Sequence, residues 1–167
     1  MKLRLLASAA LLCLACTNST GLSLDGPSFI RARVDGHFFS VEEGHVLSWG
    51  WVGYPGTFLS LNGQRTAAPD SNAYIYFQIG AFNGPGTYTL DGTTNTIPAQ
   101  NAALYGLFDG NVSPTREFET GGQYTGSITI SAMDSTTIVG TFTFSAGATL
   151  GPAGDVHLTH GSFRVSH

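Results

Sequence analysis

Histidine and carboxylate side chains gather near the end of the sequence. Asp155, His157 and His160 lie close together, and His167 is the last residue. Imidazole and carboxylate groups are common metal ligands and general acid–base catalysts. In an extended strand, however, residues 157 and 160 point to opposite faces unless a turn intervenes. Because His160-Gly161 has the composition of a turn, we interpret these histidines as solvated strand and turn residues, and we predict neither a metal ion nor a cofactor.

Two further groups of carboxylates could support hydrolysis. Glu42 and Glu43 are followed by His45, and Glu117 and Glu119 share one face of a predicted strand. Glycoside hydrolysis needs two carboxylates about 5–10 Å apart, but neighbours on one strand face commonly form a surface pair. The sequence also contains no Gly-x-Ser-x-Gly, phosphate-loop, zinc-ribbon or calcium-loop motif. We therefore predict a non-catalytic protein without catalytic residues, and an envelope hydrolase acting on glycans or another extracytoplasmic substrate is the alternative.

Four aromatic residues are the best indication of a binding site. Trp49 and Trp51 share one face of a predicted strand, and Tyr74 and Tyr76 share one face of another. An exposed flat ring offers a large apolar surface to a sugar or an apolar partner. The same rings fill or border the core when they point inward. We favour the interpretation that these four rings fill the core or cover its edge, and the alternative is a ligand platform for a glycan, a small apolar ligand or an envelope protein.

The only two cysteines, Cys13 and Cys16, lie at the start of the chain. Lys2 and Arg4 precede an uncharged apolar run, which polar residues follow, and this is the layout of a secretory signal. The apolar run is shorter than the ~20 residues that span a bilayer. Leu14-Ala15-Cys16 resembles a bacterial lipobox, with Cys13 where leucine is usual. We predict a signal peptide over residues 1–15 and a lipid on Cys16, with an ordinary secreted protein and an uncleaved anchor as alternatives.

A lipid on Cys16 would place the protein in the cell envelope. Each buried methylene contributes roughly 0.8 kcal/mol, so the two or three acyl chains of a bacterial lipoprotein hold it stably. The residue after the modified cysteine is Thr17 rather than aspartate. By resemblance to other lipoproteins, this favours the outer membrane of a Gram-negative bacterium. Residues 16–27 then form a polar tether.

The charge of the mature chain excludes two classes of partner. Cleavage before Cys16 removes Lys2 and Arg4 and leaves five arginines against eleven acidic residues, a formal charge of −6. A nucleic-acid-binding protein would carry a basic patch, so we expect no nucleic acid. Adhesion to anionic lipids by charge is equally disfavoured. Membrane attachment is therefore expected only through the lipid.

The rest of the chain has the pattern of an all-β domain. Charged residues make up only 11% of the sequence, glycine is frequent with 22 residues, and short alternating runs are bounded by turn residues. Asp35-Gly36 between two such runs is a strong hairpin signal. We predict a single domain over residues 28–167, an antiparallel β-sandwich or flattened barrel of about ten strands. The last two strands are expected at 156–159 and 163–165, on either side of the His160-Gly161 turn.

Three stretches in this order resemble small bacterial cell-envelope lipoproteins that carry a β-sandwich domain of unknown function. The first is Val34-Asp35-Gly36 with Phe38 and Phe39, and the second is 86–90, GTYTL. The third is 124–130, YTGSITI, followed by 140–144, GTFTF, and 159–163, THGSF. The resemblance implies an extracytoplasmic β-sandwich and brings no catalytic residues with it.

Overall fold

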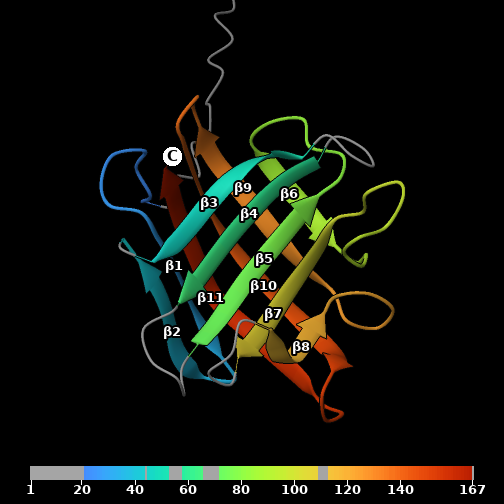
Figure 1. Cartoon of the computed structure of the whole chain (residues 1–167). Coiled ribbons are helices and arrows are strands. Elements are labelled where there is room, and N and C mark those ends of the chain that lie inside the picture. The colour runs from blue at the N-terminus through green and yellow to red at the C-terminus, as the bar shows by residue number, and fades with distance from the viewer. Residues whose placement is uncertain (1–20, 44, 53–57, 66–71, 109–112, 167) are drawn as a thin grey trace, which may run out of the picture.

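The chain folds as an all-β protein, as the sequence predicts. The computed structural model describes residues 21–43, 45–52, 58–65, 72–108 and 113–166 (Figure 1). Eleven strands and no helix are described, so no described segment is a helix that could cross a membrane. The strands are β1 (Phe29–Val34), β2 (His37–Glu42), β3 (Val46–Val52), β4 (Phe58–Arg65), β5 (Asn72–Ile79), β6 (Gly86–Leu90), β7 (Ala102–Phe108), β8 (Pro114–Glu119), β9 (Gly126–Met133), β10 (Thr137–Leu150) and β11 (Asp155–Ser166).

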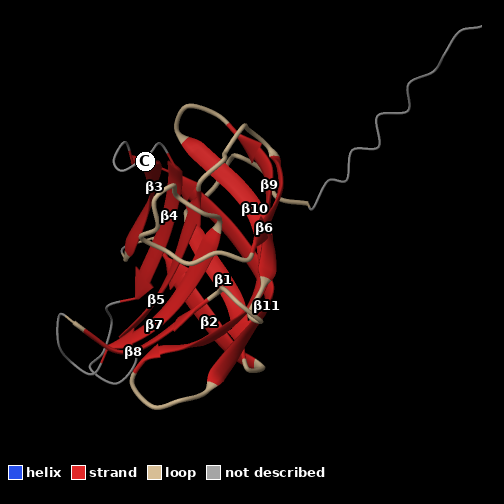
Figure 2. Cartoon of the chain, turned by 90° about the vertical axis from the view of Figure 1, so that its right-hand side faces the viewer, coloured by secondary structure: helices blue, strands red, loops and turns tan. Residues whose placement is uncertain are grey.

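All eleven strands belong to one antiparallel hydrogen-bonded sheet that folds over on itself. Its main path runs β2-β1-β11-β10-β8-β7-β5-β4-β3, and β9 and β6 branch from β10. The long strand β10 pairs with β9 along its first part and with β8 along its last part. Two layers result and face each other in Figure 2, one with β6, β9, β10, β11, β1 and β2 and the other with β8, β7, β5, β4 and β3.

The first hairpin forms where the sequence predicts it. Asp35 and Gly36 join β1 to β2, with φ angles of 50° and 82°. A two-residue hairpin turn needs positive φ at both central residues, which glycine adopts freely and aspartate tolerates. This turn places Val34 opposite His37 and lies at one open end of the sandwich.

Alternating apolar side chains fill the space between the layers. In β5 the inward residues Ala73, Ile75 and Phe77 are at most 1% exposed, whereas Tyr74 and Tyr76 on the other face are half-buried. Phe77 meets Phe142 of the opposite layer at a centroid distance of 4.9 Å. Each such buried side chain contributes about 1.5–3 kcal/mol. The core is therefore continuous from one layer to the other.

The predicted turn at His160-Gly161 is wrong, because β11 runs through both residues. Ala32 of β1 lies opposite this pair, which makes the site a β-bulge, and His160 has a φ of 53°. A left-handed residue suits a bulge as well as a turn, so composition alone did not separate the two. A side chain at Gly161 would place its Cβ 2.4 Å from the Phe142 ring, so only glycine fits here.

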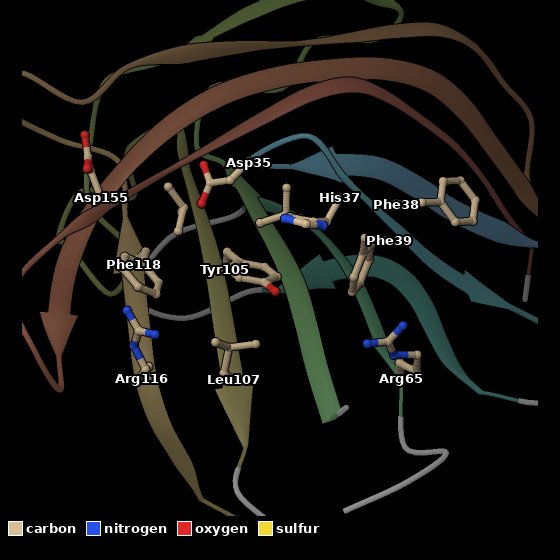
Figure 3. Close-up of a pocket in the computed structure, with 12 residues that line it drawn as sticks. Asp35, His37, Phe38, Phe39, Arg65, Tyr105, Leu107, Arg116, Phe118 and Asp155 are labelled. Atoms are coloured by element: carbon tan, nitrogen blue, oxygen red, sulfur yellow. The ribbon is translucent and has the colours of Figure 1, made fainter. Parts of the chain in front are cut away.

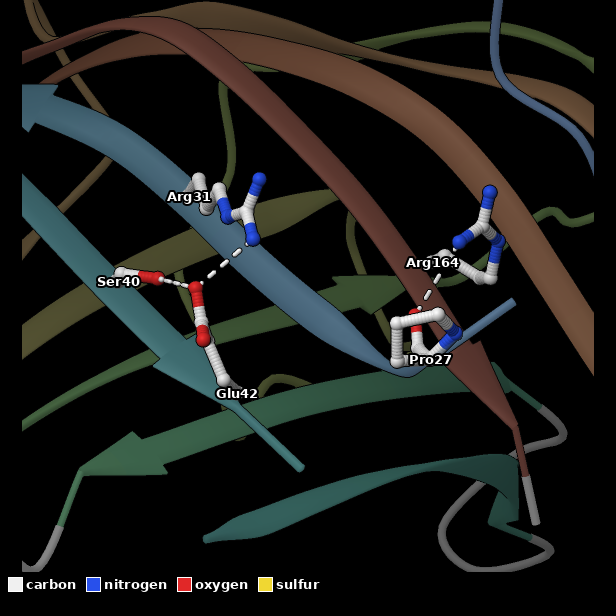
Figure 4. Close-up of polar contacts among 5 residues, drawn as sticks. All are labelled: Pro27, Arg31, Ser40, Glu42 and Arg164. Atoms are coloured by element: carbon white, nitrogen blue, oxygen red, sulfur yellow. Dashed lines mark hydrogen bonds and ion pairs between the residues drawn. The ribbon is translucent and has the colours of Figure 1, made fainter. Parts of the chain in front are cut away.

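The described part of the predicted tether, residues 21–27, is held against the domain. Arg164 of β11 donates from Nε to the Ser23 carbonyl at 2.7 Å. One of its terminal nitrogens donates to the Pro27 carbonyl at 3.2 Å (Figure 4). Its guanidinium also lies 5.5 Å from the Phe29 ring centroid. The predicted signal peptide and Cys16 lie outside the described residues.

Candidate ligand-binding cavity

A cavity of about 330 Å³ opens between the two layers at the end that carries the β1–β2 turn (Figure 3). Its size is at the lower end of the ~300–1,000 Å³ typical of small-molecule sites. One wall comes from β4, β7 and β8, and the other from β1, β2 and the start of β11. The two walls of the cavity therefore carry different sets of side chains.

Strand register places two arginines on the inner surface of the first wall. Arg116 pairs with Leu107, Leu107 with Ala73, and Ala73 with Arg65, so these residues form one row across four strands. The next row inward contains Phe118, Tyr105 and Ile75 in the same way. Residues two apart on a strand share a face. The arginines therefore lie one row nearer to the open end of the sandwich than the aromatic floor of Phe118 and Tyr105.

Both guanidinium groups lie against aromatic rings. The Cζ of Arg116 is 5.0 Å from the Phe118 ring centroid, and that of Arg65 is 5.5 Å from the Phe39 centroid. Contacts of this kind hold the guanidinium over the ring. The Nε of Arg116 is buried and has no hydrogen-bond partner among the described residues. A buried donor without an acceptor costs about 1–3 kcal/mol, so this atom is suited to a ligand oxygen.

Tyr105 lies between the two arginines in Figure 3 and forms the middle of the floor. Its ring stacks on Phe118 at 6.3 Å and meets Phe39 edge-on at 6.1 Å. Burial raises the pKa of the Tyr105 phenol, and the positive charges of Arg65 and Arg116 oppose that rise. The phenol thus stays neutral at pH 7 and can donate a hydrogen bond into the cavity.

The opposite wall carries carboxylates. Asp35 accepts a hydrogen bond from the backbone N–H of His157 at 2.8 Å and donates its own N–H to the His157 carbonyl at 2.9 Å. Asp155 lies 3.6 Å from the His157 imidazole, and both side chains are more than half exposed. No group of three or more His, Cys, Asp or Glu residues within the described ranges is arranged to hold a metal ion. The cavity is thus polarised, with positive charge on one wall and negative charge on the other.

The two tryptophans of the predicted platform are separated by burial. Trp49 is 6% exposed and donates its indole N–H to the Thr136 carbonyl at 3.2 Å, across the sandwich. Trp51 is 55% exposed and contacts Phe82 edge-on at 5.3 Å. Trp49 is therefore a core residue and not part of an exposed platform. The face of β3 that carries both tryptophans lies over the core at Trp49 and reaches the rim of the sandwich at Trp51.

The two tyrosines of the predicted platform lie on the outer surface of the second layer. Tyr74 donates its hydroxyl to Glu117 and contacts Phe108 at a ring distance of 5.2 Å. Burial raises the pKa of the Tyr74 phenol, and the Glu117 carboxylate raises it further. Burial alone raises that of Tyr76. Since Trp49 is buried in the core, Trp51 is exposed at the rim and the tyrosines lie on the outer surface, the four rings do not form one surface.

Three carboxylates outside the cavity, Glu42, Glu117 and Glu119, make local contacts. Glu42 pairs with Arg31 at 2.8 Å on the surface (Figure 4), and this contact with Arg31 holds the pKa of Glu42 below its usual range. Glu117 accepts from Tyr74, and Glu119 accepts from the backbone and hydroxyl of Thr94. Both members of the predicted surface pair therefore hold neighbouring side chains or backbone through hydrogen bonds.

The alternation of side chains along two strands contains an indication of the cavity that the amino-acid composition does not. In 59–65, LSLNGQR, the apolar phase is Leu59, Leu61 and Gly63, and Arg65 follows in that same phase. Arg116 likewise shares the phase of the inward Phe118. An arginine in the apolar phase of a strand indicates a polar group at the edge of a core.

Comparison with known proteins identifies a family but no activity. Residues 59–165, from β4 to the end of β11, match the family described as "domain of unknown function (DUF6252)". The matched stretch includes Arg65, Tyr105, Arg116 and Phe118 of the cavity. No curated protein and no solved structure matches the chain.

Proposed function

We propose that this chain, which belongs to the DUF6252 family, is a non-catalytic binding protein of the bacterial cell envelope that is anchored by a lipid on Cys16. The ligand is a small molecule held between the two layers. The observation that carries this proposal is the row of Arg65 and Arg116 in front of a buried aromatic floor. A purely structural end of the sandwich would place apolar side chains at these inward positions.

The nature of the cavity favours binding over catalysis. Its two carboxylates are on the same wall, and one of them, Asp35, is held by the backbone of His157. The opposite wall offers N–H and O–H donors around apolar rings, which is the composition of a recognition site. The lipid anchor is supported by the signal-like start of the sequence and by Ala15 immediately before Cys16.

The anchor is tested by the intact mass of the protein extracted from the membrane fraction of its host. We expect a chain that starts at Cys16 and carries acyl groups. A soluble, unacylated chain with another start would contradict the anchor and leave a free secreted protein.

The binding function is tested by the small molecules that accompany the purified protein. Val34 is half-buried and lines the cavity, so Val34→Phe should partly fill it. Val46→Phe is the matched control, since Val46 is 47% exposed and does not line the cavity. After denaturation and mass spectrometry, we expect a compound released from the wild type and from Val46→Phe but depleted from Val34→Phe. Equal recovery from all three, or from none, would refute a ligand in this cavity.

A further inference from the structure

The cavity has features that select the charge of its ligand, and the following rests on the proposed binding function. The two walls differ in sign, with Arg65 and Arg116 on one side and Asp35 and Asp155 on the other. A ligand without charge would leave the buried Nε of Arg116 without an acceptor unless it brought an oxygen to that point. A ligand with an anionic end satisfies it with a hydrogen bond between two opposite charges, which is stronger than one to a neutral oxygen.

The fork of Arg116 suits a carboxylate in particular. The guanidinium lies over the Phe118 ring with its Cζ 5.0 Å from the centroid, and this contact limits the movement of the planar group. Two adjacent N–H groups of an arginine match the two oxygens of a carboxylate.

The carboxylates of the far wall limit the charge that the ligand can carry. Asp35 and Asp155 face the same space, and a second negative charge on the ligand would be repelled by them at short range. The half-buried side chains of Val34 and Leu107, with the edge of the Tyr105 ring, offer apolar surface to the rest of the ligand. A flat apolar body with a single anionic group therefore fits the site better than a phosphate dianion or an uncharged sugar.

We propose that the cavity binds small aromatic monocarboxylates, with the carboxylate on Arg116 and the ring against Val34, Tyr105 and Leu107. Arg116 is then the residue that determines specificity for the anion, and Arg65 adds positive charge at the other end of the row.

The proposal is tested by calorimetric titration with two probes, 2-naphthoate and its uncharged analogue 2-naphthamide, at pH 7. We expect the wild type to bind 2-naphthoate with a sub-millimolar Kd and 2-naphthamide at least tenfold more weakly. Arg116→Gln should weaken 2-naphthoate at least tenfold and leave 2-naphthamide within about twofold, which also shows that the cavity is intact. Arg116→Lys keeps the charge but loses the pair of adjacent N–H groups, so its Kd for 2-naphthoate should lie between those of the wild type and Arg116→Gln.

Arg31→Gln is the matched control, because Arg31 carries the same charge in an exposed pair with Glu42 outside the cavity. It should bind both probes like the wild type. If the wild type bound the two probes equally, or if Arg31→Gln and Arg116→Gln weakened 2-naphthoate alike, selection of a carboxylate would be refuted while ligand binding in the cavity stood. If neither probe bound, the ligand class would be overturned, and the small molecules released from the membrane-derived protein would decide separately on the proposed function.

Discussion

Gly106 lies directly beneath the Tyr74 ring, and adding one methyl group there tests the packing of the outer face. A Cβ at Gly106 would be 1.9 Å from Cε1 of Tyr74 and 2.4 Å from its Cζ. Atoms do not approach so closely, so the ring must leave its position in Gly106→Ala. It would then give up its hydrogen bond to Glu117 and its contact with Phe108.

The cost follows from those two lost interactions. A hydrogen bond contributes about 0.5–1.5 kcal/mol, and an aromatic pair contributes about 0.5–1.5 kcal/mol beyond its buried area. We therefore expect Gly106→Ala to lower the free energy of unfolding by about 2 kcal/mol, within the range usual for overpacking. With a urea m-value of about 2 kcal/mol/M, the midpoint of unfolding falls by about 1 M.

A double-mutant cycle separates the steric effect from other causes. In a Tyr74→Ala background the added methyl meets no ring, and Gly106→Ala should stabilise the fold by about 0.5 kcal/mol because alanine restricts the unfolded chain. The coupling between the two sites is then about 2.5 kcal/mol. Gly50→Ala is the control, since a Cβ at Gly50 of β3 would meet no atom within 4 Å. The reasoning fails if Gly106→Ala costs the same in both backgrounds, or if it costs no more than Gly50→Ala.

Three further predictions concern other parts of the molecule. The pKa of Tyr74 is raised above its usual value of 10.0, so the stability linked to its neutral form is present below pH 10 and is lost as the pH rises above 10. The loss of folded protein with rising pH, followed by circular dichroism, should therefore be less steep in Tyr74→Phe than in the wild type. An unchanged slope would contradict this. Thr120 is 1% exposed and exchanges hydrogen bonds with two backbone groups, so Thr120→Val should lower the Tm by about 4–8 °C and Thr120→Ser should not. Arg164→Ala should speed chymotrypsin cleavage at Leu24, because the segment around it loses two hydrogen bonds to β11; cleavage at the wild-type rate would show that other contacts hold the segment.

Local patterns in the sequence were sufficient for most of the strands. Turn chemistry at Asp35-Gly36 and alternation in β5 depend on neighbours in the chain, and both predictions are confirmed. The bulge at His160 was missed because a left-handed residue ends one strand or bends another depending on its partners. Here the partners are β1 and β10, which lie far away in the sequence.

The candidate site was harder to predict than the fold. Trp49 and Trp51 have the same residue type and strand face, and only the position of the rim along β3 separates a buried ring from an exposed one. The cavity arginines come from β4 and β8, which are brought into one row by the strands between them. Their convergence depends on register across four strands, and the sequence of any one strand does not contain that information.

The attachment of residues 23 and 27 to Arg164 has a consequence for orientation. With a lipid on Cys16, as proposed, only seven residue steps separate the bilayer surface from the fixed point at Ser23, a reach of at most about 25 Å. That point adjoins the start of β1, whereas the cavity lies at its other end, about 17–20 Å further on for six residues in a strand. The mouth of the cavity would thus face the aqueous compartment, and the protein would sample dissolved compounds instead of drawing its ligand out of the lipid beneath it.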